Sequence, residues 1–247
     1  MNLKDFISTG QSRYDAVLSR LIKCPRLQLS HLGDKDSPVL RARLNPGETR
    51  PVFVVAGLHG DEIGGVTGLV DFLCSESLPK DISVDFFPVL NPSGFMSGTR
   101  RKDGVDINRD MCKSRMQPES SLLVKALSED KPSLLATLHE DGSQPFFYMY
   151  YSDEGRKPLW DRMARLASDY FDLGYGDVHG DDCVNGLIRH PSQSRVESSP
   201  KHLCSMENAA KSMGVDYVTT ETPMGASLAT RTLANRKLIQ MLLQSMS

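Results

Sequence analysis

A histidine and a glutamate stand three residues apart where an apolar run gives way to glycine and polar residues. His59 and Glu62 belong to the motif GLHGDE, residues 57–62, which closes the run VFVVAGL. An imidazole nitrogen and a carboxylate oxygen at such a turn can face one point, and zinc takes both donor types at about 2.0–2.2 Å. The pattern is short and occurs by chance, so a helix cap is the alternative. His59 and Glu62 are therefore candidate metal ligands.

A third candidate ligand follows another apolar run. A catalytic zinc site needs three protein ligands and an open position for water. His139 comes directly after LLATL, residues 134–138, and α/β folds place functional groups at the carboxyl ends of their strands. By itself His139 could be an ordinary turn histidine. The other histidines have no comparable setting, and the segment HGDD, residues 179–182, is expected to be a solvated loop; they are His31, His179, His190 and His202.

Between these motifs, residues 99–110 are rich in basic and amide side chains. Asn108 stands beside Arg109, and such a pair can hold a carboxylate through a bidentate guanidinium fork and an amide donor. A second arginine of the segment could stabilise an oxyanion. The alternative is a solvated basic loop that pairs with surface acids.

A glutamate closes the last predicted strand. Glu221 lies in TTETP, residues 219–223, where its carboxylate could face a metal-bound water as a general base. Alone, it is only a glutamate at a strand end.

Together and in this order, the motifs resemble those of the carboxypeptidase A-like (funnelin-type) zinc metallocarboxypeptidases. That fold is shared with murein peptide amidases and, more distantly, with succinylglutamate desuccinylase and aspartoacylase. The resemblance extends from about Val52 to Met224. It is carried by GLHGDE as the first zinc motif, NPSGF (91–95) as the NPDG-like turn, GVDINRD (104–110) as the GVDxNR segment, LHEDG (138–142) as the second histidine motif and TTETP as the catalytic glutamate motif.

The resemblance implies one zinc ion per chain, bound by His59, Glu62 and His139, the set of two histidines and one glutamate that holds the catalytic zinc of carboxypeptidase A. It also implies that Asn108 and Arg109 clamp the substrate carboxylate. Finally, the resemblance implies that Glu221 is the general base and acid of the reaction.

Two further assignments follow from the resemblance. Asp106 corresponds to an aspartate that accepts a hydrogen bond from the first zinc histidine and fixes its ring; a surface aspartate is the alternative. In short family members the oxyanion arginine stands five residues before the glycine of GVDxNR, where this chain has Thr99. Arg100 is therefore predicted for that role, with Arg101 as the alternative. No counterpart of the family's substrate-covering tyrosine is found before Glu221.

The implied reaction is amide hydrolysis by a metal-activated water. The leading interpretation is a zinc metallocarboxypeptidase or amidase that acts on a small peptide. The alternative is an N-acyl-amino-acid deacylase of the succinylglutamate desuccinylase/aspartoacylase type. A non-enzymatic interaction module is a third possibility, and the presence of every expected ligand and of the base argues against it.

Apolar periodicity predicts the elements that must position these motifs. Short apolar runs predict buried strands, and the i, i+3, i+4 spacing predicts helices. The alternation favours an α/β fold, with a single domain over residues 1–247 and a mixed β-sheet sandwiched by helices. Residues 174–199 are predicted to form a long surface loop that borders a binding site. The predicted strands are 52–58, 82–90, 134–138 and 216–220, and the predicted helices are 14–22, 62–74, 121–128, 157–170 and 228–243.

Composition narrows the class of partner and compartment. The 247 residues carry 29 Lys and Arg against 31 Asp and Glu, so neither nucleic acid nor an anionic membrane is an expected partner. No apolar stretch reaches the roughly 18 residues of a membrane span, and the N-terminus lacks a secretory signal, which predicts a cytoplasmic protein. An odd number of cysteines without Cys-x-x-Cys predicts reduced thiols and no disulfide framework; they are Cys24, Cys74, Cys112, Cys183 and Cys204. The sequence does not indicate an oligomeric state.

Overall fold

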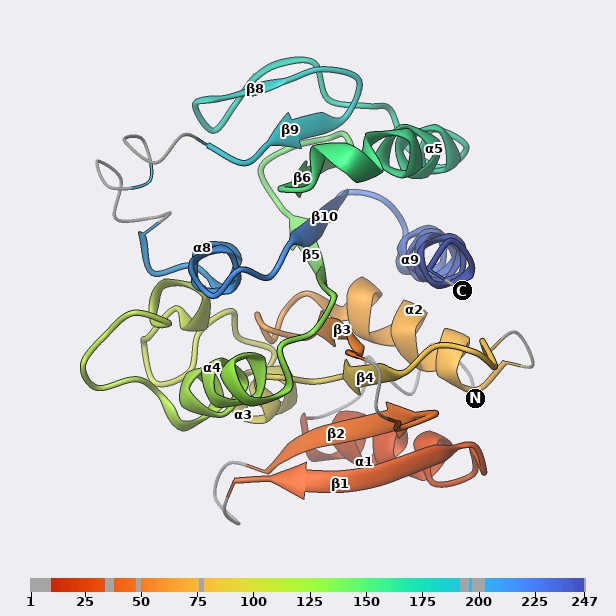
Figure 1. The fold of residues 1–247 in the computed structure, drawn as a ribbon, viewed down its shortest axis with the longest axis vertical. Helices are drawn as coiled ribbons and strands as arrows, with labels where there is room; N and C mark the ends of the chain where they lie inside the picture. Colours follow the sequence, from red (N-terminus) through yellow and green to blue (C-terminus); the bar gives the residue numbers. More distant parts are fainter. Residues whose placement is uncertain are drawn as a thin grey trace.

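A mixed sheet runs through the computed structural model, which describes residues 10–33, 38–47, 50–75, 78–191, 196 and 203–246. The strand order is β1-β2-β4-β3-β5-β10-β6-β9 (Figure 1). The central strands β4, β3, β5 and β10 are parallel to one another, and β2 and β6 join them antiparallel. The strand bounds are β1 Leu27–Leu32, β2 Val39–Leu44, β3 Val52–Ala56, β4 Val84–Phe87, β5 Leu134–Asp141, β6 Tyr148–Tyr151, β9 Leu187–Arg189 and β10 Tyr217–Pro223.

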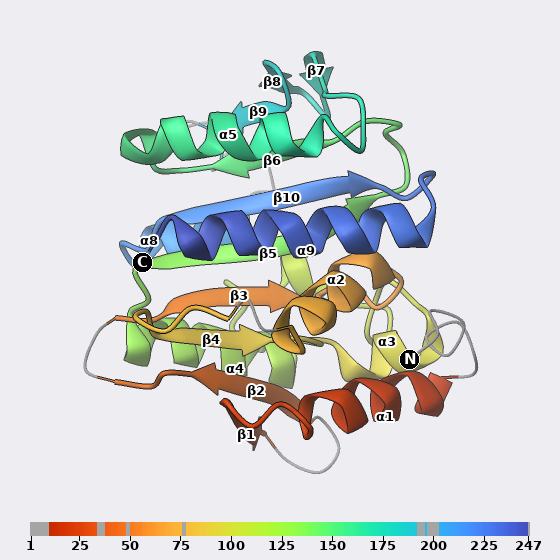
Figure 2. The same cartoon turned by 90° about the vertical axis from the view of Figure 1, so that its right-hand side faces the viewer.

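Helices cover both faces of this sheet (Figure 2). The helices α1, α2, α5 and α9 lie on one face, and α4 and α8 lie on the other. The sequence of β3 is apolar throughout because both of its faces are buried. Val54 packs with the first group of helices, and Phe53 packs with the second. The helix bounds are α1 Gly10–Leu21, α2 Ile63–Leu73, α3 Pro92–Ser97, α4 Pro118–Asp130, α5 Lys157–Ala167, α8 Met206–Ser212 and α9 Leu228–Gln244, with short 3₁₀ turns η2 Ile107–Arg109 and η3 Glu154–Arg156.

The predicted fold class is confirmed, and each predicted strand and helix is present with shifted ends. Strand β5 continues three residues beyond the predicted 134–138 and therefore includes His139 itself. Strands β1, β2 and β6 and helices α3 and α8 were not predicted. Their runs are short or mix polar and apolar residues, which leaves little periodicity to detect.

The prediction of an irregular loop over residues 174–199 is wrong in its first part. That part contains β7 Gly176–Val178, β8 Asp181–Cys183 and β9. Each strand has three residues, too few for an alternating pattern to emerge. The turn between β7 and β8 places His179 at φ 55° and Gly180 at φ 82°, the two positive values that a tight hairpin turn needs. Residues 192–195 and 197–200 lie outside the described part of the chain.

The cysteine prediction also needs correction. Cys112 and Cys204, 92 residues apart, form a disulfide with a Cα–Cα distance of 4.7 Å. The backbone brings them together, since the amide of Met111 donates to the carbonyl of Cys204 at 3.0 Å. A pairing made by tertiary structure leaves no mark in the local spacing of cysteines. Cys24, Cys74 and Cys183 are free thiols.

None of the helices in the described ranges combines the length and the apolar character needed to cross a membrane.

Candidate active site

Glycines shape the turn that carries the first two candidate ligands. Strand β3 ends at Ala56, and Gly57 then takes a left-handed conformation with φ 61°. Gly60 lies against the backbone of Gly94, so closely that a Cβ atom at residue 60 would overlap it. The motif therefore needs glycine at 57 for conformation and at 60 for close approach.

The NPSGF segment forms the surface against which this turn packs. Asn91 caps helix α3, with its Oδ1 accepting a hydrogen bond from the amide of Gly94 at 2.9 Å. Pro92 occupies the first turn of that helix, where a missing N–H costs nothing. The cap fixes the Gly94 backbone that Gly60 touches, so the two motifs are parts of one local structure.

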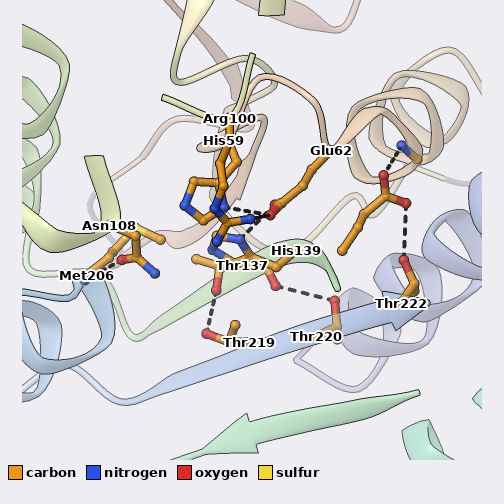
Figure 3. Close-up of polar contacts among 12 residues, drawn as sticks. His59, Glu62, Arg100, Asn108, Thr137, His139, Met206, Thr219, Thr220 and Thr222 are labelled. Carbon is orange, nitrogen blue, oxygen red and sulfur yellow. Dashed lines mark hydrogen bonds and ion pairs between the residues drawn. The ribbon is translucent and has the colours of Figure 1, made fainter. Parts of the chain in front are cut away.

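Three buried side chains converge at the carboxyl ends of β3 and β5 (Figure 3). His59 Nδ1 lies 2.6 Å from Glu62 Oε1, and His139 Nδ1 lies 2.8 Å from Glu62 Oε2. Their candidate ligand atoms all lie within 4.8 Å of one another. The three residues are 1–2% exposed. The structure thus brings His59, Glu62 and His139 into a group that could hold a metal ion.

The two imidazole rings differ in the contacts of their Nε2 atoms, which are the ring nitrogens that do not contact Glu62. His59 Nε2 lies 3.1 Å from Asp106 Oδ1, and that oxygen also accepts the amide of Asn108 at 2.9 Å. Asp106 thereby directs His59 Nδ1 toward Glu62. In contrast, His139 Nε2 is buried and has no hydrogen-bond partner among the described residues. The orientation of the His139 ring therefore depends on its contact with Glu62 and on the backbone of β5.

The three groups strongly perturb one another. Burial by itself raises the pKa of Glu62, but the charges of His59 and His139 lower it well below its ordinary value. For His59, burial lowers the pKa, while the Glu62 charge and hydrogen bonds with Asp106 and Glu62 raise it to about 9. A carboxylate between two imidazoles therefore stays ionised, which is the form that binds a metal.

Glu221 lies beside this group on the neighbouring strand. It pairs with His139 in the parallel register of β5 and β10, and its side chain lines the adjoining cavity. Burial raises the pKa of Glu221 to about 8 against the opposing charge of His139, and the Glu62 charge adds to the rise. A proton acceptor with a pKa in this range suits general acid–base chemistry near neutral pH.

Of the two arginines considered for the oxyanion role, Arg100 reaches the candidate site. Its Nη1 donates to Glu62 Oε1 at 3.0 Å, and its side chain, 45% exposed, lines the cavity. Arg101 is exposed and is absent from the cavity wall. The geometry thus favours Arg100, the first of the two predictions.

Asn108 and Arg109 lie in η2 at the cavity wall. The amide of Met206 donates to Asn108 Oδ1 at 2.8 Å, and Arg109 Nη1 donates to the Asn108 carbonyl at 2.6 Å. The Cys112–Cys204 disulfide joins the same two segments, the one after η2 and the one before α8. The predicted carboxylate clamp is therefore anchored to α8, an element that the sequence did not reveal.

A cavity of about 640 Å³ opens onto Glu221 and the predicted clamp residues. The sequence did not indicate much of its wall. His179 is exposed in the turn between β7 and β8, as predicted for a solvated segment, and its Nε2 also lies 2.8 Å from Asp141 Oδ2 at the cavity edge. His190 also lines it, with Nδ1 2.6 Å from the Tyr217 hydroxyl. The other wall residues that the sequence did not single out include Tyr148, Tyr150, Ser205, Glu207, Asn208 and Thr219.

Among the missed residues, Glu207 contacts the predicted clamp directly. Its Oε2 lies 3.5 Å from Asn108 Nδ2, and its Oε1 accepts the Thr219 hydroxyl at 3.0 Å. Burial raises the pKa of Glu207, but the charges of His139 and Arg109 and the hydrogen bonds that its carboxylate accepts together lower it below its ordinary value. The one sequence signal for this segment was Ser205, which is the N-cap of α8 and stands two residues before Glu207.

Comparisons with known proteins agree with this geometry. Residues 48–140 match the family model of the succinylglutamate desuccinylase/aspartoacylase catalytic domain. The resemblance predicted from the motifs is confirmed. This match spans His59, Glu62 and His139 and ends before Glu221. This part of the chain is therefore similar to the catalytic domain of that family. No curated protein matches the sequence.

Solved structures share the fold over nearly the whole chain. A protein from Shewanella baltica, named a "putative metallopeptidase", superposes with a TM-score of 0.81 at 22% identity over 96% of this chain and 92% of that one. A metallo-carboxypeptidase from Burkholderia cenocepacia gives 0.71 at 16% identity, over 96% and 70%. A succinylglutamate desuccinylase/aspartoacylase from Rhodobacter sphaeroides gives 0.60 at 16% identity, over 89% and 65%. The fold is that of zinc carboxypeptidases.

Proposed function

We propose that this chain is a zinc-dependent hydrolase that cleaves an amide bond in a small peptide, as a metallocarboxypeptidase or amidase. The observation that carries the proposal is the convergence of His59, Glu62 and His139 beside a cavity that Glu221 and Arg109 line. A metal cluster, a carboxylate and a fixed guanidinium around one cavity are the parts that amide hydrolysis at a chain end needs.

The residues present fit zinc as the metal. Two imidazoles and one carboxylate are the ligand set of known catalytic zinc sites. His59 Nδ1, His139 Nδ1 and the Glu62 carboxylate already face one another, and Asp106 holds the first ring from behind. Bound zinc would supply a Lewis acid and a more acidic water.

The protein side chains then have distinct tasks. Glu221 accepts a proton from the attacking water and passes it to the leaving amine. The Arg100 guanidinium donates to the oxygen that becomes negatively charged during attack. Asn108 and Arg109 hold the substrate carboxylate and so place the scissile amide.

The alternative function, deacylation of an N-acyl amino acid, rests on the family model that matches residues 48–140. Both reactions use the same metal, water and base and differ in the acyl side of the amide. Turnover of short peptides, a cell-wall tripeptide and acetyl- or succinyl-amino acids by zinc-loaded protein would decide between them. We expect the higher kcat/KM for release of a C-terminal residue or a murein-type amide, and higher values for simple N-acyl amino acids would favour the deacylase.

Arg109→Lys is expected to raise KM with little change in kcat. A lysine replaces the planar fork with a point charge, and a hydrogen bond to a charged group contributes about 1.5–3 kcal/mol, or roughly 10- to 100-fold in KM. Amidating the substrate C-terminus should weaken wild-type catalysis strongly and that of the variant little. Equal losses in both enzymes would show that Arg109 does not bind the carboxylate.

Glu207→Gln is expected to relax discrimination against acidic substrates. Its ionised carboxylate faces the cavity, so a second carboxylate on the substrate is repelled, and the isosteric amide removes that repulsion. The ratio of kcat/KM for a glutamate-ended peptide to that for a glutamine-ended one should rise by about tenfold, the equivalent of about 1.4 kcal/mol. The exposed Glu129→Gln serves as control. An unchanged ratio would remove Glu207 from substrate selection.

A further inference from the structure

A buried carboxylate directly beside the candidate metal site has no part in the proposed chemistry. Glu140 follows His139 in β5, and its side chain is 0% exposed. Successive strand residues point to opposite faces, so the carboxylate of Glu140 lies on the face covered by α2 and α9, although the residue also borders the cavity. A carboxylate in such a place is costly unless it is fully paired.

Glu140 is fully engaged, and each partner comes from a different element. Its Oε2 accepts hydrogen bonds from the amide of Gly64 in α2 at 2.9 Å and from Arg231 Nη1 in α9 at 2.6 Å. Its Oε1 accepts the Thr222 hydroxyl in β10 at 3.2 Å (Figure 3). One side chain therefore links four elements: β5, α2, α9 and β10.

Each of these contacts leads to a residue of the site. Gly64 stands two residues after Glu62, Thr222 follows Glu221 directly, and Glu140 itself follows His139. The positions of the carboxylate ligand, the second imidazole ligand and the proposed base thus depend on backbones that meet at Glu140.

The local sequence is adapted to this contact. A Cβ atom at Gly64 would overlap Glu140 Oε1, and one at Gly65 would lie 3.0 Å from the Leu138 carbonyl oxygen. Two successive glycines therefore let the first turn of α2 approach β5. The Glu140 carboxylate also lies at the N-terminus of α2, where the positive end of the helix dipole stabilises a negative charge, and Arg231 neutralises that charge.

The contacts of Glu140 matter most for the position of the His139 ring. Because His139 Nε2 has no hydrogen-bond partner among the described residues, nothing behind the ring fixes it as Asp106 fixes His59. The path of β5 has to set its position instead.

We propose that Glu140 is a positioning residue, which holds Glu62, His139 and Glu221 in the arrangement that binds the metal and activates water. This proposal rests on the metal site proposed above. It assigns no chemical step to Glu140, which acts through the residues that it aligns.

The test compares zinc release and kinetics in wild type and Glu140→Gln. The amide keeps the size of the side chain but removes the charge that pairs with Arg231. We expect zinc to pass from the loaded variant to a chromogenic chelator at a lower chelator concentration. The affinity should weaken by about tenfold, the lower end of the roughly 10- to 100-fold loss that follows removal of a direct hydrogen-bond partner of a metal ligand, because Glu140 acts on the ligands through the backbone. The kcat should fall with little change in KM, because the substrate clamp is untouched.

Asp85→Asn is the matched control. Asp85 is also 0% exposed and pairs with Arg41 and Arg43, but in β4 and away from the cavity wall. It should lower the melting temperature as Glu140→Gln does while zinc affinity and kcat stay at the wild-type level. Loss of zinc affinity in proportion to melting temperature in both variants would reduce Glu140 to a stabilising role and overturn the proposal.

Thr222→Val keeps the test decisive if Glu140→Gln does not fold. It removes one hydrogen bond to Glu140 at nearly constant shape, and we expect a smaller change in the same direction for both zinc affinity and kcat. Wild-type zinc affinity and kcat in whichever variant folds would overturn the positioning role and leave the proposed function intact. Absence of zinc binding by the wild type would overturn both.

Discussion

Glu221→Gln is expected to lose most turnover while the protein keeps its fold and its zinc. The amide has the size of the carboxylate but cannot accept the proton of the attacking water, and general base catalysis contributes about 10²- to 10⁴-fold. The loss should appear in kcat and in kcat/KM alike, since the interaction exists in the transition state only. Steady-state kinetics on a cleaved peptide, with zinc content measured on the same sample, would show it.

The structure supports this choice of residue over the other carboxylates near the cavity. Glu221 pairs in register with His139, and burial raises its pKa to about 8, so it can take up and release a proton near neutral pH. Glu207 has its pKa lowered and is already hydrogen-bonded to Thr219. If Glu221→Gln hydrolysed peptides near the wild-type rate, another acceptor would have to do this work.

The agreement between sequence and structure at the site has a simple physical origin. Strands β3, β5 and β10 are parallel neighbours, so residues that follow their apolar runs meet at one edge of the sheet. A continuous apolar run marks such a strand because both its faces are buried. His59, His139 and Glu221 could therefore be predicted as neighbours before the order of the strands was known.

The cavity wall could not be predicted in this way. His190 follows the three-residue strand β9 and Glu207 lies in α8, so neither follows an apolar run long enough to detect in the sequence. Cys112 and Cys204 meet for the same reason. Contacts between distant segments depend on the packed fold, so substrate preference is less accessible from sequence than the metal site is.

Glu140 shows a different limit. A glutamate directly after a candidate ligand looks like part of the LHEDG motif, yet strand alternation turns it to the opposite face. Its partners Gly64 and Arg231 are 76 and 91 residues away. The sequence indicates which face it occupies once the strand is known, but not what it contacts there.

His59→Ala and His139→Ala are each expected to abolish stoichiometric zinc binding. Each removes one of three protein ligands, so the loss should exceed the roughly 10- to 100-fold weakening that follows loss of an outer hydrogen-bond partner. Turnover should fall with zinc content. Elemental analysis after dialysis against a trace of chelator would measure it, with His31→Ala, an exposed histidine in β1, as control.

The two substitutions remove different contacts around the site. His59→Ala leaves Asp106 hydrogen-bonded to the Asn108 amide, so the clamp segment keeps one anchor, whereas His139→Ala removes a ring whose Nε2 had no partner to lose. Glu62 keeps a charged partner in both variants, because Arg100 still faces it. Both proteins should therefore fold. Undiminished zinc in folded His59→Ala and His139→Ala would place the metal elsewhere and refute the site, whereas zinc lost only in the two variants ties the ion to these ligands.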